Sequence, residues 1–161
     1  MKPVRKNKEG WQYHLNQGEG DCLRSLLSQF PITANVPAKI SRTDSDPQTV
    51  DREKLLNESL AEHRRELKKQ AANLLAPGKF KRGEKGYVLA LNLEEREILL
   101  QILNDIRIGS WHVLGEPEEL EPETAPQTEK EVVFYSLMNL AGYFEAAFLH
   151  ASGGDPQSGH D

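Results

Sequence analysis

Four residues with side chains suited to recognition lie close together in the second half of the chain: Asn104, Asp105, Arg107 and Trp111. On a helix, Asn104, Arg107 and Trp111 would share one face, and Asp105 would point elsewhere. Arginine and tryptophan are frequent hot-spot residues of protein interfaces. The cluster therefore predicts a polar recognition patch with Trp111 as its aromatic anchor. The alternative, which we favour at this stage, is structural: Asp105 and Arg107 would hold the helix to neighbouring loops by charge-assisted hydrogen bonds.

A second group of charged residues could bind nucleic acid. Phosphate neutralisation needs a basic surface, but the chain as a whole has a formal net charge of -5. No nucleic-acid-binding motif accompanies the cluster, so a solvated charged face is the simpler interpretation. A nucleic-acid-binding regulator remains the alternative function. The basic residues of this group are Arg64, Arg65, Lys68, Lys69, Lys79, Lys81, Arg82 and Lys85.

Catalytic and metal-binding patterns are missing from the sequence. The five histidines form no matched pair at helical spacing, and no glycine-rich phosphate loop is present. The single cysteine, Cys22, excludes an internal disulfide and fits a reducing cytoplasm. It lacks the surroundings of a nucleophile, so we expect a small buried hydrophobe. We therefore predict a cytoplasmic protein that is not an enzyme and has no cofactor or metal.

Hydrophobic periodicity predicts the elements that position these residues. The predicted fold class is mainly α, a four-helix core with a minor two-stranded antiparallel β element. Residues 1–150 would form one domain and residues 151–161 a disordered tail. Residues 32–46, the basic segment 79–85 and the acidic segment 116–131 would be loops or linkers. The strands are expected at about 11–15 and 87–91, and the helices at about 19–30, 47–75, 93–114 and 129–151.

The strand–helix arrangement is repeated in the sequence. Residues 11–27 align without gaps with residues 87–103. In both copies an asparagine precedes a glutamate by three positions (Asn16 with Glu19, and Asn92 with Glu95), as in a helix capping box. Two such units could pair their strands. The alternative is a chance match of two amphipathic patterns.

The last predicted helix is apolar on more than one face. Such a helix is either central in the core or shared with a partner, and we expect self-association through it as a homodimer. No run approaches the roughly 20 apolar residues that span a bilayer, so no membrane contact is expected.

Residues 103–115 read LNDIRIGSWHVLG and resemble the "LNDLRL…LG" signature of the bacterial DUF2017 family. The acidic helix start at 93–97 is also similar, as is the Asp46-Pro47 start of a long charged helix. The segment between the first two helices is shorter and more polar than in that family. The resemblance implies at most a regulatory or adaptor role, linked to Clp-type proteolysis by neighbouring genes, and it assigns no catalytic residue. We therefore expect a non-enzymatic regulatory or adaptor-like protein-interaction domain.

Overall fold

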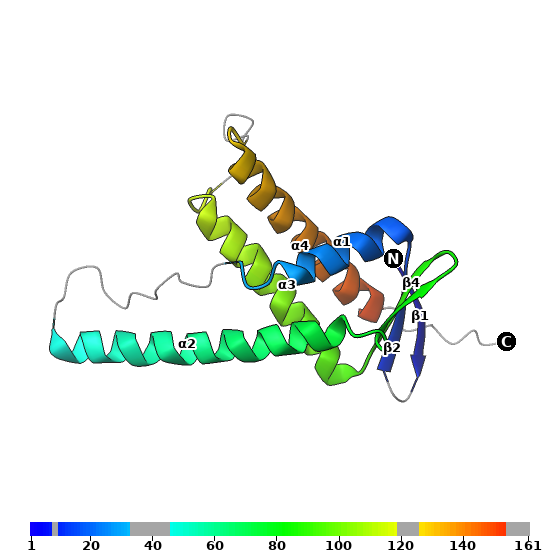
Figure 1. Cartoon of the computed structure of the whole chain (residues 1–161), viewed down its shortest axis with the longest axis horizontal. Coiled ribbons are helices and arrows are strands. Elements are labelled where there is room, and N and C mark those ends of the chain that lie inside the picture. Colours follow the sequence, from blue (N-terminus) through cyan, green and yellow to red (C-terminus); the bar gives the residue numbers. More distant parts are fainter. Residues whose placement is uncertain (8–9, 33–45, 119–125, 154–161) are drawn as a thin grey trace.

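The computed structural model describes residues 1–7, 10–32, 46–118 and 126–153, and within them the chain is mainly α. Two strands and two helices follow one another, and the same order is then repeated (Figure 1). The first set is β1 (Lys2–Asn7), β2 (Gly10–Leu15), α1 (Gln17–Ser28) and α2 (Pro47–Leu74). The second set is β3 (Phe80–Gly83), β4 (Gly86–Leu91), α3 (Leu93–Val113) and α4 (Glu129–Gly153).

The strands form one antiparallel sheet in the order β1-β2-β4-β3. The two predicted strands are its centre, and Tyr13 pairs with Leu89 where β2 meets β4. The prediction of a two-stranded element is wrong, because β1 and β3 flank this pair. The strand β3 lies in the basic segment 79–85, which was predicted to be a linker, and β1 lies in another basic segment, for which no strand was predicted. Charged residues, lysine above all, are common on edge strands because they discourage pairing with other chains, so the basic composition hid these two strands.

The two halves of the sheet are related by an approximate two-fold axis. Gly10 begins β2 and Gly86 begins β4, and both have a positive φ (147° and 141°). A Cβ atom at Gly10 would overlap the carbonyl oxygen of Leu91, and one at Gly86 would overlap that of Leu15. Each strand therefore begins with a glycine because the end of the other central strand lies against it.

Each central strand leads into its helix through the same cap. Asn16 Oδ1 accepts the N–H of Glu19 at 2.9 Å, and Asn92 Oδ1 accepts that of Glu95 at 2.8 Å. Both glutamates in turn accept the backbone N–H of their asparagine at 2.9 Å. These are the predicted capping boxes, so the repeat in the sequence is also a repeat in the structure.

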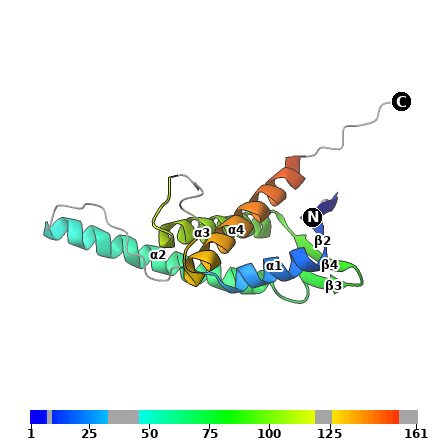
Figure 2. The same cartoon turned by 90° about the horizontal axis from the view of Figure 1, so that it is seen from above.

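Buried side chains from both the sheet and the helices form the hydrophobic core. Figure 2 shows the sheet beside the helices. The expectation of a core made by four helices is therefore too narrow, because the sheet supplies about a third of the large buried side chains. The buried residues of the sheet are Tyr13, Leu15, Phe80, Tyr87, Leu89 and Leu91. Those of the helices include Leu23, Leu26, Leu27, Leu67, Leu74, Leu99, Ile102, Leu103, Ile106, Phe144 and Phe148.

The four predicted helices are present, with ends that differ by about two residues from the prediction. Parts of the predicted loops, residues 33–45 and 119–125, lie outside the described residues. So do residues 154–161, which hold most of the predicted tail, while α4 continues to Gly153. The division into one domain and a tail stays a prediction.

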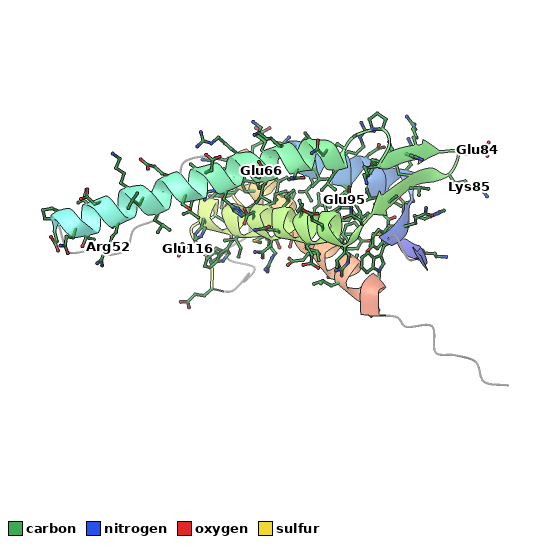
Figure 3. All side chains as sticks on the ribbon, turned by 90° about the horizontal axis from the view of Figure 1, so that it is seen from below. Arg52, Glu66, Glu84, Lys85, Glu95 and Glu116 are labelled. Carbon is green, nitrogen blue, oxygen red and sulfur yellow. The ribbon has the colours of Figure 1, made fainter. Side chains whose placement is uncertain are left out.

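The helix α2 projects beyond the rest of the molecule. Its buried residues, Leu67, Ala71 and Leu74, all lie in its last third. Between Pro47 and Glu66, a stretch that is described throughout, no side chain is buried. All three views show the N-terminal end of α2 extending past α3 and α4, and Figure 3 places Arg52 at that end.

Candidate functional site

A surface groove of about 610 Å³ lies between α3 and α4. It is formed mainly by apolar and aromatic side chains, and two of them stay well exposed, Ile108 at 40% and Tyr143 at 50%. A groove with exposed apolar walls is a common site of protein recognition. Its lining residues are Arg107, Ile108 and Trp111 from α3, and Met138, Asn139, Gly142 and Tyr143 from α4.

Arg107 stands at the edge of this groove and joins the two helices. One of its terminal nitrogens donates to Asn104 Oδ1 at 2.9 Å. Its Nε lies 3.1 Å from Glu145 Oε2 of α4, forming an ion pair. The Arg107 side chain is 43% exposed and that of Glu145 is 22% exposed, so solvent weakens this pair only in part. The contact fixes where the guanidinium lies, between the groove and water.

Trp111 forms one end of the groove and is half-buried. Its Nε1 donates to the carbonyl oxygen of Pro117 at 3.2 Å, which ties the chain after α3 back onto the helix. Nearby, His112 Nδ1 lies 2.6 Å from Glu116 Oε1. Because the indole N–H is already bonded, what Trp111 offers to a ligand is the apolar surface of its ring.

Asp105 belongs to a different contact. Burial raises the pKa of its carboxyl, and the charges of Arg64 and His63 on α2 partly oppose that rise. In the same region His63 Nε2 lies 2.9 Å from the side-chain amide nitrogen of Gln101. The structure thus places Arg107 and Trp111 at the groove with Asn104 supporting the arginine. It places Asp105 towards α2, near Arg64 and His63.

Sequence reasoning missed half of the groove. The groove residues Ile108, Met138, Gly142 and Tyr143 were not among the predicted site residues. The available signal was that α4 has more apolar positions than one core face needs. Its buried residues are Ala141, Phe144 and Phe148, and further large apolar residues remain exposed: Val132, Val133, Tyr143 and Leu149.

Within the described residues, α4 is the one helix long and apolar enough to cross a membrane by length and composition alone. The sequence-based expectation that no stretch approaches this length and composition is therefore corrected. The core helix of a water-soluble domain meets the same criterion. In this structure α4 packs along α3, buries Phe144 and Phe148, and places Glu145 beside Arg107. Part of its apolar surface is thus used in the core, and the rest faces outward beside the groove.

The basic cluster is divided between two elements. Arg64, Arg65, Lys68 and Lys69 lie on α2, and the others lie at or near the β3–β4 hairpin. Some of these cations already have acidic partners: Arg65 pairs with Glu62 at 2.9 Å, and Lys79 pairs with Glu95 at 2.6 Å. Figure 3 shows Glu84 and Lys85 together at the tip of the hairpin. Acidic residues are therefore interspersed through the cluster.

Cys22 is exposed on α1, so the expectation of a small buried hydrophobe is wrong. The helical stripe of α1 that faces the core is made by Leu23, Leu26 and Leu27, and Cys22 lies beside it. Among the residues that the structure describes, no group of three His, Cys, Asp or Glu side chains is placed to hold a metal ion.

No protein-family profile, no curated protein and no solved structure matches this chain. The resemblance to the DUF2017 family therefore stays a prediction that rests on the residues quoted for it.

Proposed function

We propose that this chain is a non-enzymatic protein-interaction domain, regulatory or adaptor-like, that binds its partner through the α3–α4 groove. The observation that carries the proposal is the composition of this groove. Trp111, Tyr143 and Arg107 meet there around apolar side chains from both helices. Tryptophan, tyrosine and arginine are the residue types that dominate binding energy in protein interfaces.

Further exposed apolar side chains lie on α4 outside the groove. Exposed apolar surface on one element can mark an interaction site. On α4 the exposed residues are Val132, Val133 and Leu149, in addition to Tyr143 of the groove itself. A partner helix with an apolar stripe would fit this surface.

The cytoplasm is the compartment we propose, and a link to Clp-type proteolysis is what the DUF2017 resemblance implies. The expected homodimer also belongs to this proposal. Self-association through α4 would compete with a foreign partner for the same groove, so oligomeric state and partner binding should be measured on the same variants.

The test replaces one apolar residue on each wall of the groove by a charge. Ile108→Glu and Met138→Glu, each in the full tagged chain, should lose the partner that the unchanged chain captures from its native host. Leu93→Glu is the matched control, because Leu93 is apolar, 61% exposed and does not line the groove. Circular dichroism confirms that each variant is folded. A captured set that is identical for all four proteins would contradict the proposal.

The alternative function, a nucleic-acid-binding regulator using the basic cluster at 64–85, stays a prediction. Gel-shift experiments at low salt test it, because binding through phosphate contacts weakens steeply as salt rises. Binding that is unaffected by Met138→Glu and is lost with Arg64→Glu would replace the groove by the basic cluster as the functional surface.

A further inference from the structure

The outward side of α4 carries a line of exposed side chains that repeats every seven residues. Successive positions of this line are four and then three residues apart, the spacing that keeps side chains on one seam of a helix packed along another helix. Every position of the line is exposed, so the rest of the chain leaves it open to solvent. We call this line the α4 seam, and its residues are Val132, Ser136, Asn139, Tyr143, Ala146 and His150.

The α4 seam has no Asp, Glu, Lys or Arg side chain, although these types make up 28% of the chain. Between Val132 and His150 the one residue of these types is Glu145, which lies off the seam and pairs with Arg107 of α3. At 1.5 Å per residue the seam extends for about 27 Å. An exposed line of this length without a charge costs little to desolvate, and it indicates a surface that another molecule covers.

The side chains of the seam suit a second helix as the occupant. Ser136 and Ala146 are small, and the distance between two packed helices depends on the size of the side chains at their contact. Tyr143 is 50% exposed, and its hydroxyl donates to Glu19 Oε1 at 3.1 Å, so the hydroxyl oxygen can still accept a hydrogen bond. Asn139, four residues before it, carries an amide that can donate one.

We propose that the α4 seams of two copies pack against each other antiparallel, across a two-fold axis that passes near residue 141. In this register every position of the seam lies beside another position of the seam. A surface that complements itself in this way is what a two-fold dimer requires. Ordered outward from the axis, the pairs between the two copies are Asn139 with Tyr143, Ser136 with Ala146, and Val132 with His150.

Two physical reasons favour the antiparallel direction. Antiparallel helices oppose their macrodipoles, whereas parallel helices would align them and bring the two Glu129 ends together. The antiparallel register also brings the Asn139 amide of each copy to the Tyr143 hydroxyl of the other. The polar side chains near the axis then have hydrogen-bond partners when water is excluded, which avoids the cost of burying them unsatisfied.

A lipid surface is the other occupant that an apolar helix of this length could have. Helices that lie in a membrane interface are rich in lysine and arginine on their polar face. On α4 the one residue of these two types is Lys130, and the seam itself includes the polar side chains of Ser136, Asn139 and His150. The composition of α4 therefore favours a second copy of the chain over a membrane.

This inference rests on the proposed function, because it specifies the homodimer that belongs to it, and the seam shares Asn139 and Tyr143 with the α3–α4 groove. Ala146 belongs to the seam and does not line the groove, whereas Ile108 lines the groove from α3. Ala146→Glu should therefore weaken the dimer and leave partner capture intact. Ile108→Glu should lose the captured partner and leave the dimer intact. Failure of the dimer and failure of partner binding are thus seen in different variants.

The oligomeric state of the full chain tests the proposal first. Sedimentation and light scattering across a range of protein concentrations should show a dimer. Ala146→Glu places a charge on the seam and should weaken the dimer about tenfold or more. The control Leu93→Glu places a charge at an exposed apolar position at the start of α3 and should leave the dimer unchanged. Circular dichroism confirms that each variant is folded.

The orientation is tested by disulfide formation in a chain whose exposed Cys22 is replaced by serine. A mixture of Ser136→Cys and Ala146→Cys chains should form a mixed disulfide on oxidation, because these two positions lie side by side in the antiparallel register. Each variant alone should form little disulfide. Its two cysteines would lie ten residues apart along the helices, about 15 Å, whereas a disulfide needs Cα atoms within about 7 Å.

Four results would overturn the proposal. A monomer at every concentration would remove the dimer itself. A dimer that resists Ala146→Glu would place the contact on another surface. Ser136→Cys chains that link to themselves would exclude the antiparallel register. A monomer that sediments with phosphatidylcholine vesicles, and no longer does so with Ala146→Glu, would assign the α4 seam to a lipid surface.

Discussion

Gly20 offers a sharp test of how α1 is packed on the sheet. It lies in the buried first part of α1, and a Cβ atom there would come within 2.6 Å of Cγ of Tyr87 and closer still to another ring atom. Tyr87 is poorly placed to move away. Its ring is buried and lies 5.0 Å from that of Phe80, and its hydroxyl donates to Asp21 Oδ1 at 2.5 Å.

The change Gly20→Ala combines two opposite effects. In an open helix, replacing glycine by alanine gains up to about 1 kcal/mol. Forcing a methyl group into a packed core costs about 1–3 kcal/mol, and the overlap with the Tyr87 ring is at the severe end of that range. We therefore expect a net loss of about 1–2 kcal/mol, which lowers the Tm of a domain of this size by roughly 2–8 °C.

Gly18 provides the control within the same helix. A Cβ atom there would meet only Asn16 Oδ1, at 3.4 Å, so Gly18→Ala should be neutral or slightly stabilising. Urea unfolding followed by circular dichroism gives the free energy of unfolding of both variants. Equal stability of the two would show that α1 does not lie against Tyr87, and the described packing of α1 on the sheet would be wrong.

Three further predictions concern charged groups. Arg107→Ala removes a partly exposed ion pair with Glu145 and should lower the free energy of unfolding by about 1 kcal/mol; a much larger loss in urea unfolding would make Arg107 a structural residue only. Burial raises the pKa of Glu95, but hydrogen bonds, chiefly from Lys79, outweigh this and leave the pKa below its ordinary value. Its stabilising effect is lost as the pH falls through that lowered pKa, so Glu95→Gln should show a smaller fall in Tm between about pH 5 and about pH 3 than the unchanged chain. Because burial raises the pKa of Asp105, ionisation of its carboxyl opposes folding. Asp105→Asn should therefore raise the Tm at neutral pH. This gain in Tm should vanish in acid, where the Asp105 carboxyl is protonated in both the folded and the unfolded chain.

Local signals predicted the centre of the fold well. The capping boxes at Asn16 and Asn92 depend on side chains three residues apart, so the sequence alone contains the information. The strands before them alternate or are continuously apolar, and both were recognised. The edge strands β1 and β3 were missed because each depends on pairing with a neighbouring strand, which a local sequence pattern does not show. Its own lysines and arginines resemble those of a linker.

The sequence predicted only those groove residues that belong to α3. Arg107 and Trp111 lie four residues apart on α3, and helical spacing alone predicts that they share a face. Met138 and Tyr143 join them because α4 lies along α3 at a particular rotation, which depends on how Phe144 and Phe148 fill the core. The exposure of Cys22 was mispredicted for the same reason. It depends on which side of α1 meets the sheet, and Leu23 and Leu27 decide that side.

The two-fold relation of the sheet makes its two halves depend on one another. Each half, β1 to α2 or β3 to α4, contributes one central strand and one edge strand, and Gly10 and Gly86 each accommodate the strand end of the opposite half. Neither half could bury its central strand by itself, since a lone hairpin is marginal in water. Each half therefore supplies the surface that the other half needs, as the two subunits of a symmetric dimer do. Co-expression of the two halves as separate polypeptides should therefore regenerate the folded domain.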